Sequence, residues 1–249
     1  LRLGIAAHCL VRATDPDEAR TRLTGVLESY GLWESQYTSL LHPVMGDLEK
    51  PFLGLARETF DQLADEVDAI CHSGALVHWT LPLERFISPN LVSMHEVLRL
   101  ASTGRGKVVH YISTASTLPK HAGYRLNEDE NEYGYATSKY FAERMVAAAR
   151  WRGAEAYVYR LPFVTASAAT GQFRRDRGDF LHNLVSGSLE LGCFPALAAR
   201  LDGVLPVDYL AQTVVSIATT TTTTDHRPLS GRDIDFANGQ APSFDEFFA

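Results

Sequence analysis

Two stretches decide the fold: KVVHYIST at residues 107–114 and YATSKYFAERMVAAARWR at residues 135–152. The first is a short apolar run typical of a buried strand, and the second is long enough for a helix of about five turns. Further short apolar runs lie on both sides of these stretches, at residues 7–12, 40–44, 67–72 and 156–160, and amphipathic stretches separate them. Strands that alternate with helices predict a parallel sheet with helices on both faces.

Start and stop signals place the helices between these runs. Asp15 is a suitable N-cap with Pro16 at the first helical position, and Gly31 ends that helix. The six threonines at residues 219–224 are expected to form a loop, because β-branched residues do not favour extending a helix. The remaining elements are expected as helices at 59–66, 90–101, 135–152, 179–192 and 207–218, a short strand at 233–236 and a capping box at 243–246.

Charge and composition limit the partners. The 249 residues carry a formal charge of −7, which gives no reason to expect a nucleic acid or an anionic membrane as partner. The three cysteines, Cys9, Cys71 and Cys193, are too widely spaced for a disulfide framework or a zinc site. A cytoplasmic location is therefore expected, and no apolar run approaches the ~20 residues of a membrane helix.

The stretch from Tyr135 to Lys139 places a phenol and an ammonium one helical turn apart. A nearby cation favours the phenolate, so we expect the pKa of Tyr135 to fall below its usual ~10 and the side chain to donate a proton near neutral pH. Ser113 and Thr114 end the upstream strand, and only one of the two hydroxyls should face such a site. The plain alternative is an exposed Tyr and Lys on a solvated helix, and hydroxyls that cap the following turn.

Arg12 ends the first predicted strand, where a Rossmann-like sheet meets the adenosine ribose of a dinucleotide. An acidic residue there favours NAD, whereas an arginine accommodates the 2′-phosphate of NADP. Arg22 on the next helix could add charge. The glycine-rich turn that cradles a pyrophosphate should precede Arg12 by a few dozen residues, and residues 1–6 are too short to hold it. We therefore expect the first strand and this turn to be missing.

The strand that ends in Ser-Thr, followed by Y-x-x-S-K on a long helix, resembles the Ser/Thr–Tyr–Lys triad of extended short-chain dehydrogenases. The resemblance implies that Thr114 is the triad hydroxyl, that Tyr135 is the acid and that Lys139 is its partner and holds the nicotinamide ribose. It also implies that Asn90, on the preceding helix, supports the lysine.

The same resemblance assigns the cofactor contacts. Arg22 is the better candidate to join Arg12 at the 2′-phosphate, and Asp47 in the turn Gly-Asp-Leu48 would meet the adenine amino group. The small-residue turn Ser73-Gly74-Ala75 would let the backbone approach the diphosphate. Leu161-Pro162 resembles the segment that covers the nicotinamide.

Several longer stretches are more specific than the triad: GDLEKPFLGL, HSGALVHWTLP, YGYATSKYFAERM, GQFRRDRGDFLHNLVSGSLELGCFP and LPVDYLAQTVV. They resemble thioester reductase domains, which terminate non-ribosomal peptide synthetases and some polyketide synthases. Carboxylic acid reductases and aminoadipate reductases carry relatives. The fold expected from the pattern and the resemblance is α/β, a Rossmann-like doubly wound parallel sheet with a smaller C-terminal substrate-binding subdomain, incomplete at both ends.

The pattern changes after about residue 165, so residues 1–165 are expected to form the NADP-binding domain. Residues 166–249 would form mainly the substrate-side subdomain, with some segments returning to the Rossmann-like core.

The resemblance implies an NADPH-dependent oxidoreductase. A carrier protein, expected in the same polypeptide, would deliver an acyl or peptidyl chain as a phosphopantetheine thioester. Hydride transfer to the thioester carbonyl would then release an aldehyde and a free thiol, and a second transfer could give an alcohol. Tyr135 and Thr114 would hydrogen-bond the developing oxyanion.

Three alternatives share parts of this pattern. One is a redox-inactive relative that releases its chain by cyclisation, and another is a sugar-nucleotide epimerase or dehydratase with the same triad. The third is a non-enzymatic regulator that binds NADP without turnover. The intact set of Thr114, Tyr135 and Lys139 argues against the first and third, and Arg12 together with the HSGALVHW loop argues against the second.

Overall fold

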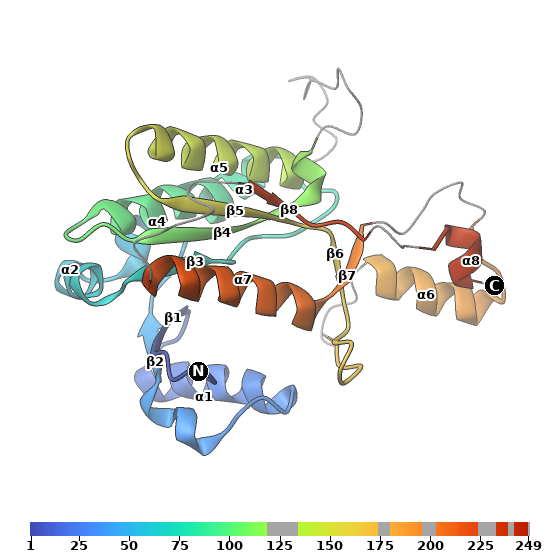
Figure 1. Cartoon of the computed structure of the whole chain (residues 1–249), viewed down its shortest axis with the longest axis horizontal. Coiled ribbons are helices and arrows are strands. Elements are labelled where there is room, and N and C mark those ends of the chain that lie inside the picture. The colour runs from blue at the N-terminus through green and yellow to red at the C-terminus, as the bar shows by residue number, and fades with distance from the viewer. Residues whose placement is uncertain (119–133, 174–179, 196–202, 224–232, 239–241, 249) are drawn as a thin grey trace. The chain divides into compact units, whose positions relative to one another are not determined.

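A computed structural model describes residues 1–118, 134–173, 180–195, 203–223, 233–238 and 242–248 of the chain. The strands form three sheets, in the orders β1-β2, β3-β4-β5-β8 and β6-β7. The described residues fall into two compact units, one made from 1–111 and 134–156 and the other from 112–118 and 157–248. The expected α/β class with a parallel sheet is confirmed, and Figure 1 shows the helices and strands of each unit.

The first unit carries most of the alternating pattern. Its elements are β1 (Ala7–Val11), α1 (Pro16–Ser29), η1 (Ser35–Ser39), β2 (Leu41–Met45), η2 (Pro51–Gly54), α2 (Arg57–Glu66), β3 (Ala69–His72), α3 (Glu84–Phe86), η3 (Ile87–Val92), α4 (Ser93–Ser102), the start of β4 (Val108–Thr114) and α5 (Gly134–Trp151). β1 pairs in parallel with β2, and β3 pairs in parallel with β4.

Local signals start the first helix as expected. The Asp15 side chain accepts a hydrogen bond from the backbone N–H of Glu18 at 2.8 Å, and Pro16 occupies the first turn. The Glu18 carboxylate in turn accepts from the backbone N–H of Thr14 at 2.7 Å, one residue before the N-cap Asp15, whose own N–H is the donor in a standard capping box. Gly31 follows the helix with a φ of 64°, a left-handed conformation that glycine adopts without strain.

The core of the first unit lies between β3 and β4 and the helices α4 and α5. Val109 and Tyr111 of β4, Met94 of α4 and Val146 of α5 are fully buried, and α4 packs on both β3 and α5 (Figure 1). β4 is buried at almost every position, as a strand covered on both faces requires. Its apolar run therefore marks the centre of this unit.

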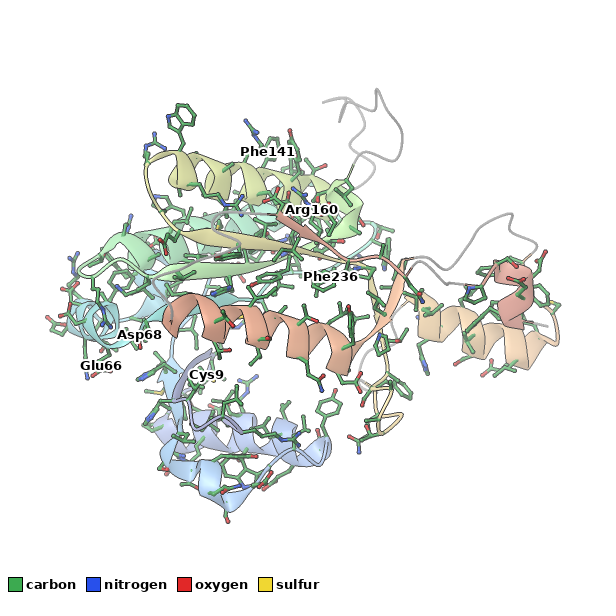
Figure 2. The ribbon with its side chains drawn as sticks, viewed as in Figure 1. Cys9, Glu66, Asp68, Phe141, Arg160 and Phe236 are labelled. Carbon is green, nitrogen blue, oxygen red and sulfur yellow. The ribbon has the colours of Figure 1, made fainter. Side chains whose placement is uncertain are left out.

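The second unit holds the end of β4 and the described residues from 157 onward. Its further elements are η4 (Ala115–Thr117), β5 (Ala156–Leu161), β6 (Phe163–Thr165), α6 (Phe180–Leu191), β7 (Val204–Pro206), α7 (Val207–Thr223), β8 (Asp233–Asp235) and α8 (Phe244–Phe248). The guanidinium of Arg160, labelled in Figure 2, pairs with Asp233 at 2.6 Å and with Asp235 at 3.2 Å. This pairing ties β5 to β8, which run parallel.

An aspartate fixes the start of α7. The Asp208 carboxylate accepts hydrogen bonds from the backbone N–H groups of Ala169 and Ala168 and from the Ser167 hydroxyl. These bonds lower the pKa of Asp208 to about 2, because they stabilise the charged form. The segment after β6 is thereby held to the first turn of α7.

The threonine run is the clearest error of the sequence-based assignment. α7 continues through Thr223 instead of ending near residue 218. The hydroxyls of Thr219 and Thr220 donate to backbone carbonyls one turn back, to Val215 at 2.9 Å and to Ser216 at 2.8 Å. These bonds let threonine remain in a helix that its branching disfavours. Thr224 lies outside the described residues.

Other expectations differ in detail. β6 and β7 pair as short parallel strands that the sequence pattern did not reveal. The Ser243 capping box is confirmed, since the Ser243 and Glu246 side chains exchange hydrogen bonds with each other's backbone N–H at 3.2 and 2.7 Å. The domain boundary near residue 165 stays a prediction. No helix within the described ranges is long and apolar enough to cross a membrane.

A left-handed turn follows β2. Phe52 and Leu53 have φ angles of 55° and 58°, a strained conformation for side chains of this size. The Glu96 carboxylate on α4, whose side chain is 4% exposed, accepts from the backbone N–H of Phe52 at 2.8 Å and pairs with Arg99 at 3.2 Å. The guanidiniums of Arg99 and Arg57 lie 4.7 and 5.1 Å from the centre of the Phe52 ring. These contacts hold the turn in place.

Replacing Glu96 tests this account of the turn. Glu96→Ala leaves the partly buried backbone N–H of Phe52 without its acceptor, so we expect the free energy of unfolding to fall by about 1–3 kcal/mol. Urea unfolding measures the change. The exposed Glu28 of α1 is the matched control, and Glu28→Ala should change stability by less than about 0.5 kcal/mol. Equal losses for the two variants contradict the role given to Glu96.

Candidate active site

A close backbone contact positions the start of α5. A Cβ atom on Gly134 would lie 2.6 Å from the carbonyl oxygen of Leu81 and 2.7 Å from the nitrogen of Leu83. Only glycine lets the helix approach the loop before α3 this closely. Tyr135 follows directly, and its ring lies 6.1 Å from that of the fully buried Phe86. The first turn of α5 is thus fixed by packing on both sides of Tyr135.

Lys139 lies one turn further along α5 and is 2% exposed. Its Nζ is 4.4 Å from the centre of the Tyr111 ring on β4, a cation–π arrangement. Burial lowers the pKa of Lys139 to about 7, although the charge of Glu143 acts in the opposite direction. The ammonium is therefore close to its titration point at neutral pH.

The pKa of Tyr135 differs from the expectation. We expected the neighbouring lysine to lower it, but burial raises the pKa of Tyr135 to about 12. The phenolate would lose its hydration in this environment, and that loss dominates. The expected direction was therefore wrong. The phenol is fully protonated at neutral pH, which is the form that a proton donor needs.

Asn90 connects α5 to the turn after β3. It lies on η3, a π-helical segment of the kind that often marks functional sites. Its side-chain amide donates to the Ser138 hydroxyl at 2.9 Å and to the carbonyl of Leu76 at 3.1 Å, and accepts from the Leu76 N–H at 2.8 Å. The Ser138 hydroxyl donates to the carbonyl of Tyr135 at 2.7 Å. Asn90 thus holds the residue next to Lys139.

Ser138 is a supporting residue that the sequence argument did not single out. It is fully buried and lies between the two residues of the motif. The serine in the motif Y-x-x-S-K could have identified it from the sequence. A hydroxyl at that position can accept from a side chain of a neighbouring helix while donating to its own helix.

The cations expected near a 2′-phosphate lie together at the end of β1. Arg12 is 73% exposed, and the Arg22 guanidinium donates to the backbone carbonyl of Arg12. Glu49 pairs with Arg12 at 3.6 Å and Glu18 pairs with Arg22 at 3.7 Å. Both guanidiniums are on the surface, so an anionic group can reach them by displacing weak ion pairs.

The turn that carries Asp47 is closely packed. The backbone N–H of Asp47 donates to the carbonyl of Leu53 at 2.6 Å, and its carboxylate accepts from the N–H of Glu49 at 3.0 Å. A Cβ on Gly46 would lie 2.5 Å from the same carbonyl oxygen. The left-handed turn at residues 52–53 therefore places Asp47 at the end of β2.

Leu48 lies against the small-residue turn after β3. A Cβ on Gly74 would lie 2.4 Å from the Leu48 side chain, so the two expected cofactor segments are in contact. Ser73 is exposed and Ala75 is half-buried. Asp47-Leu48 and Ser73-Gly74-Ala75 therefore follow the carboxyl ends of β2 and β3, and the carboxyl end of a parallel strand is where α/β sheets bind ligands.

Thr114, Leu161 and Pro162 belong to the second unit. Thr114 is half-buried, and its hydroxyl accepts from the backbone N–H of Ser116 at 3.2 Å, which caps η4. Ser113 is buried. Leu161 ends β5, and the residue after Pro162, Phe163, donates its N–H to Gly203 at 2.7 Å.

The chemistry of these groups fits a nicotinamide dinucleotide. Exposed guanidiniums suit a phosphate, a carboxylate acceptor suits an adenine amino group, and a glycine turn at a strand end suits a diphosphate. Tyr111 adds a buried hydroxyl that has no hydrogen-bond partner among the described residues. His72 stacks on the Tyr111 ring at 5.8 Å, and burial lowers its pKa to about 3. Within the described ranges, no cluster of His, Cys, Asp and Glu could hold a metal ion.

Comparison with protein families gives one match over most of the chain. Residues 3–214 match the model of an NAD-binding family described as "Male sterility protein".

Known proteins resemble the chain over most of its length. It is 52% identical over 245 residues to a PKS-NRPS hybrid synthetase of Aspergillus candidus, covering 98% of the chain and 10% of the synthetase. It is 33% identical over 232 residues to the L-2-aminoadipate reductase of Saccharomyces cerevisiae, covering 85% of the chain and 16% of the reductase. The chain thus spans a small part of these relatives.

A solved structure shows the same fold. The terminal R domain from the myxalamid PKS-NRPS pathway superposes with a TM-score of 0.86 at 34% identity. The match covers 97% of this chain and 61% of that domain.

A substitution of Gly134 tests whether its close approach to the loop before α3 positions the first turn of α5. Gly134→Ala forces a methyl group against backbone atoms, so the first turn of α5 must move. We expect nicotinamide nucleotide turnover to fall by about 10-fold or more, because displacements near 1 Å can cost about 10²-fold. Steady-state kinetics measures the change. Gly25→Ala in α1, where the added methyl meets open space, is the control and should be neutral. A Gly134 variant with normal turnover contradicts the contact's role.

Proposed function

The chain belongs to the NAD-binding family described as "Male sterility protein", and from this premise we propose that it is the thioester reductase domain of a biosynthetic synthetase. Its reaction is the NADPH-dependent release of an acyl or peptidyl chain from a phosphopantetheine thioester, as an aldehyde. The observation that carries the proposal is the protonated Tyr135 one turn from a buried Lys139 on α5. The likeness to an R domain and to synthetase and reductase relatives supports it.

The residues assigned to cofactor binding cover each part of the dinucleotide, from the 2′-phosphate to the nicotinamide. Arg12 and Arg22 hold the 2′-phosphate, and Asp47 meets the adenine beside Leu48. The turn at residues 73–75 lets the backbone approach the diphosphate, and Asn90 fixes the loop that follows. Leu161 and Pro162 cover the nicotinamide in this proposal, and Lys139 binds its ribose. The bound nicotinamide supplies the hydride.

Tyr135 acts on the carbonyl oxygen of the thioester. Its hydroxyl donates a hydrogen bond to this oxygen, polarises the carbonyl and transfers a proton as negative charge develops there. Thr114 is the second donor in this proposal, on the strength of the sequence motif. The charge of Lys139 favours the phenolate that the proton transfer leaves behind.

The tetrahedral product is a hemithioacetal, and its collapse releases the chain. The carbon–sulfur bond breaks, the carbonyl re-forms, and the hydroxyl proton passes to the departing thiolate. The products are an aldehyde and the free thiol of the carrier arm. One hydride and one proton are consumed for each chain released, so the two-electron reduction is balanced. A second hydride transfer, to the aldehyde, would consume a second NADPH and give an alcohol.

The partner in this proposal is an acyl or peptidyl carrier protein. The PKS-NRPS hybrid synthetase relative is about ten times as long as the matched region, since that region covers 10% of it. We therefore propose that the carrier lies in the same polypeptide. Binding energy from the carrier and its arm would place the carbonyl beside the hydride donor.

Tyr135→Phe tests the proton donor. The variant should bind NADPH nearly as well as the native protein, and its turnover of an acyl-carrier thioester should fall by about 10²-fold or more. The loss of NADPH absorbance gives the turnover, and its dependence on the NADPH concentration shows how well NADPH binds. Tyr140→Phe, on the same helix, removes an identical hydroxyl and should keep normal turnover. If Tyr135→Phe also keeps normal turnover, the assigned role is wrong.

Arg12→Ala tests the choice of cofactor. Removing the guanidinium should raise the dissociation constant for NADPH by about 10-fold and leave that for NADH nearly unchanged, because only NADPH has the 2′-phosphate. Fluorescence titration of each nucleotide gives the two constants. Arg152→Ala, which removes a surface charge at the end of α5, should affect neither. Equal weakening of both nucleotides by Arg12→Ala would show that Arg12 does not recognise the phosphate.

A further inference from the structure

We propose that Glu143 is a positioning residue, a buried counter-charge that keeps the Lys139 ammonium charged and in place over the Tyr111 ring. The inference rests on the proposed function, because it assigns a role to a residue that supports the same reaction. It adds a third member, one turn further along α5, to the Tyr135 and Lys139 pair.

The spacing on α5 brings the three side chains to one face. Tyr135, Lys139 and Glu143 follow one another at intervals of four residues, and such residues are neighbours on a helix. Lys139 is 2% exposed and Glu143 is 7% exposed. Lysine and glutamate are almost never buried to this extent unless they are paired with an opposite charge.

The titratable groups around the ammonium come from three elements. Among the described residues, Tyr135 and Glu143 lie on α5, Tyr111 lies on β4 under the ammonium, and His72 stacks on Tyr111 from β3. Burial raises the pKa of both tyrosines and lowers that of His72, so these three groups are uncharged near neutral pH. Glu143 is therefore the negative charge of this set.

The effect of Glu143 on the lysine has a definite sign. Burial lowers the pKa of Lys139 and the Glu143 charge raises it, and the balance is about 7. Lys139 thus loses its charge as the pH rises through this value. Without the carboxylate only the lowering effect remains, and the loss of charge begins at a lower pH. Activity that needs the ammonium should follow the same shift.

The experiment is a pH profile of kcat for the full protein with NADPH and an acyl-carrier thioester. Glu143→Gln removes the charge and keeps the size of the side chain. Its alkaline limb, where activity falls as the pH rises, should move to lower pH by about one unit or more. Below that limb the variant should recover to within about threefold of the native kcat, because Lys139 is charged there in both proteins.

Two further variants test whether the charge of Glu143 causes the shift. Glu143→Asp keeps the charge but shortens the side chain by one methylene group, so its limb should lie between those of the native protein and the Gln variant. Glu58→Gln removes one exposed carboxylate of α2 and should leave the profile unchanged. If Glu143→Gln does not fold, Glu143→Met, which also removes the charge and keeps the length of the side chain, carries the test, and an unmoved limb then contradicts the inference.

The outcomes separate this inference from the proposed function. An unshifted limb in Glu143→Gln, with either full activity or a uniform loss at every pH, overturns the role of Glu143. That result leaves the proposed function intact if the native protein reduces the thioester and Tyr135→Phe does not. A native protein that oxidises no NADPH with the thioester overturns the proposed function itself.

Discussion

The buried ammonium of Lys139 is the interaction on which the arrangement of this protein depends most. A lysine that is 2% exposed must be held by neighbours, and here the Tyr111 ring of β4 lies 4.4 Å beneath it. The helix that carries it can sit so deep because Gly134 at its start contacts backbone atoms directly. Asn90 then fastens the helix to the turn after β3 through Ser138. The burial of this charge costs stability, and such costly buried charges are typical of catalytic sites.

The opposite end of the proposed cofactor site is built differently. There the chain relies on backbone shape, because the strained turn at Phe52 and Leu53 sets the position of Asp47. Glu96 holds that turn from α4, and the charged side chains that would meet a phosphate stay on the surface. One end of the site therefore depends on a buried charge and the other on backbone geometry. Both kinds of support come from residues outside the catalytic motif.

Much of the fold follows from the sequence, and the failures have physical causes. The strands around residues 7–12 and 107–114 are apolar runs between clear breakers, so their pattern determines them. The threonine run failed because hydroxyl-to-carbonyl bonds, as in Thr219, offset a poor helix propensity. The pKa of Tyr135 was expected in the wrong direction because burial cannot be read from a four-residue spacing. Glu143 and Glu96 were missed for the same reason, since both owe their roles to burial.

The transfer of a hydride to the released chain is the central claim, and isotope labelling tests it most directly. The full protein would be given an acyl-carrier thioester and NADPH that carries deuterium at both positions of C4 of the nicotinamide. The account predicts an aldehyde with deuterium on its carbonyl carbon, one free carrier thiol and one oxidised nucleotide for each chain released, all measured by mass spectrometry. A chain released without deuterium and without oxidation of NADPH would contradict it.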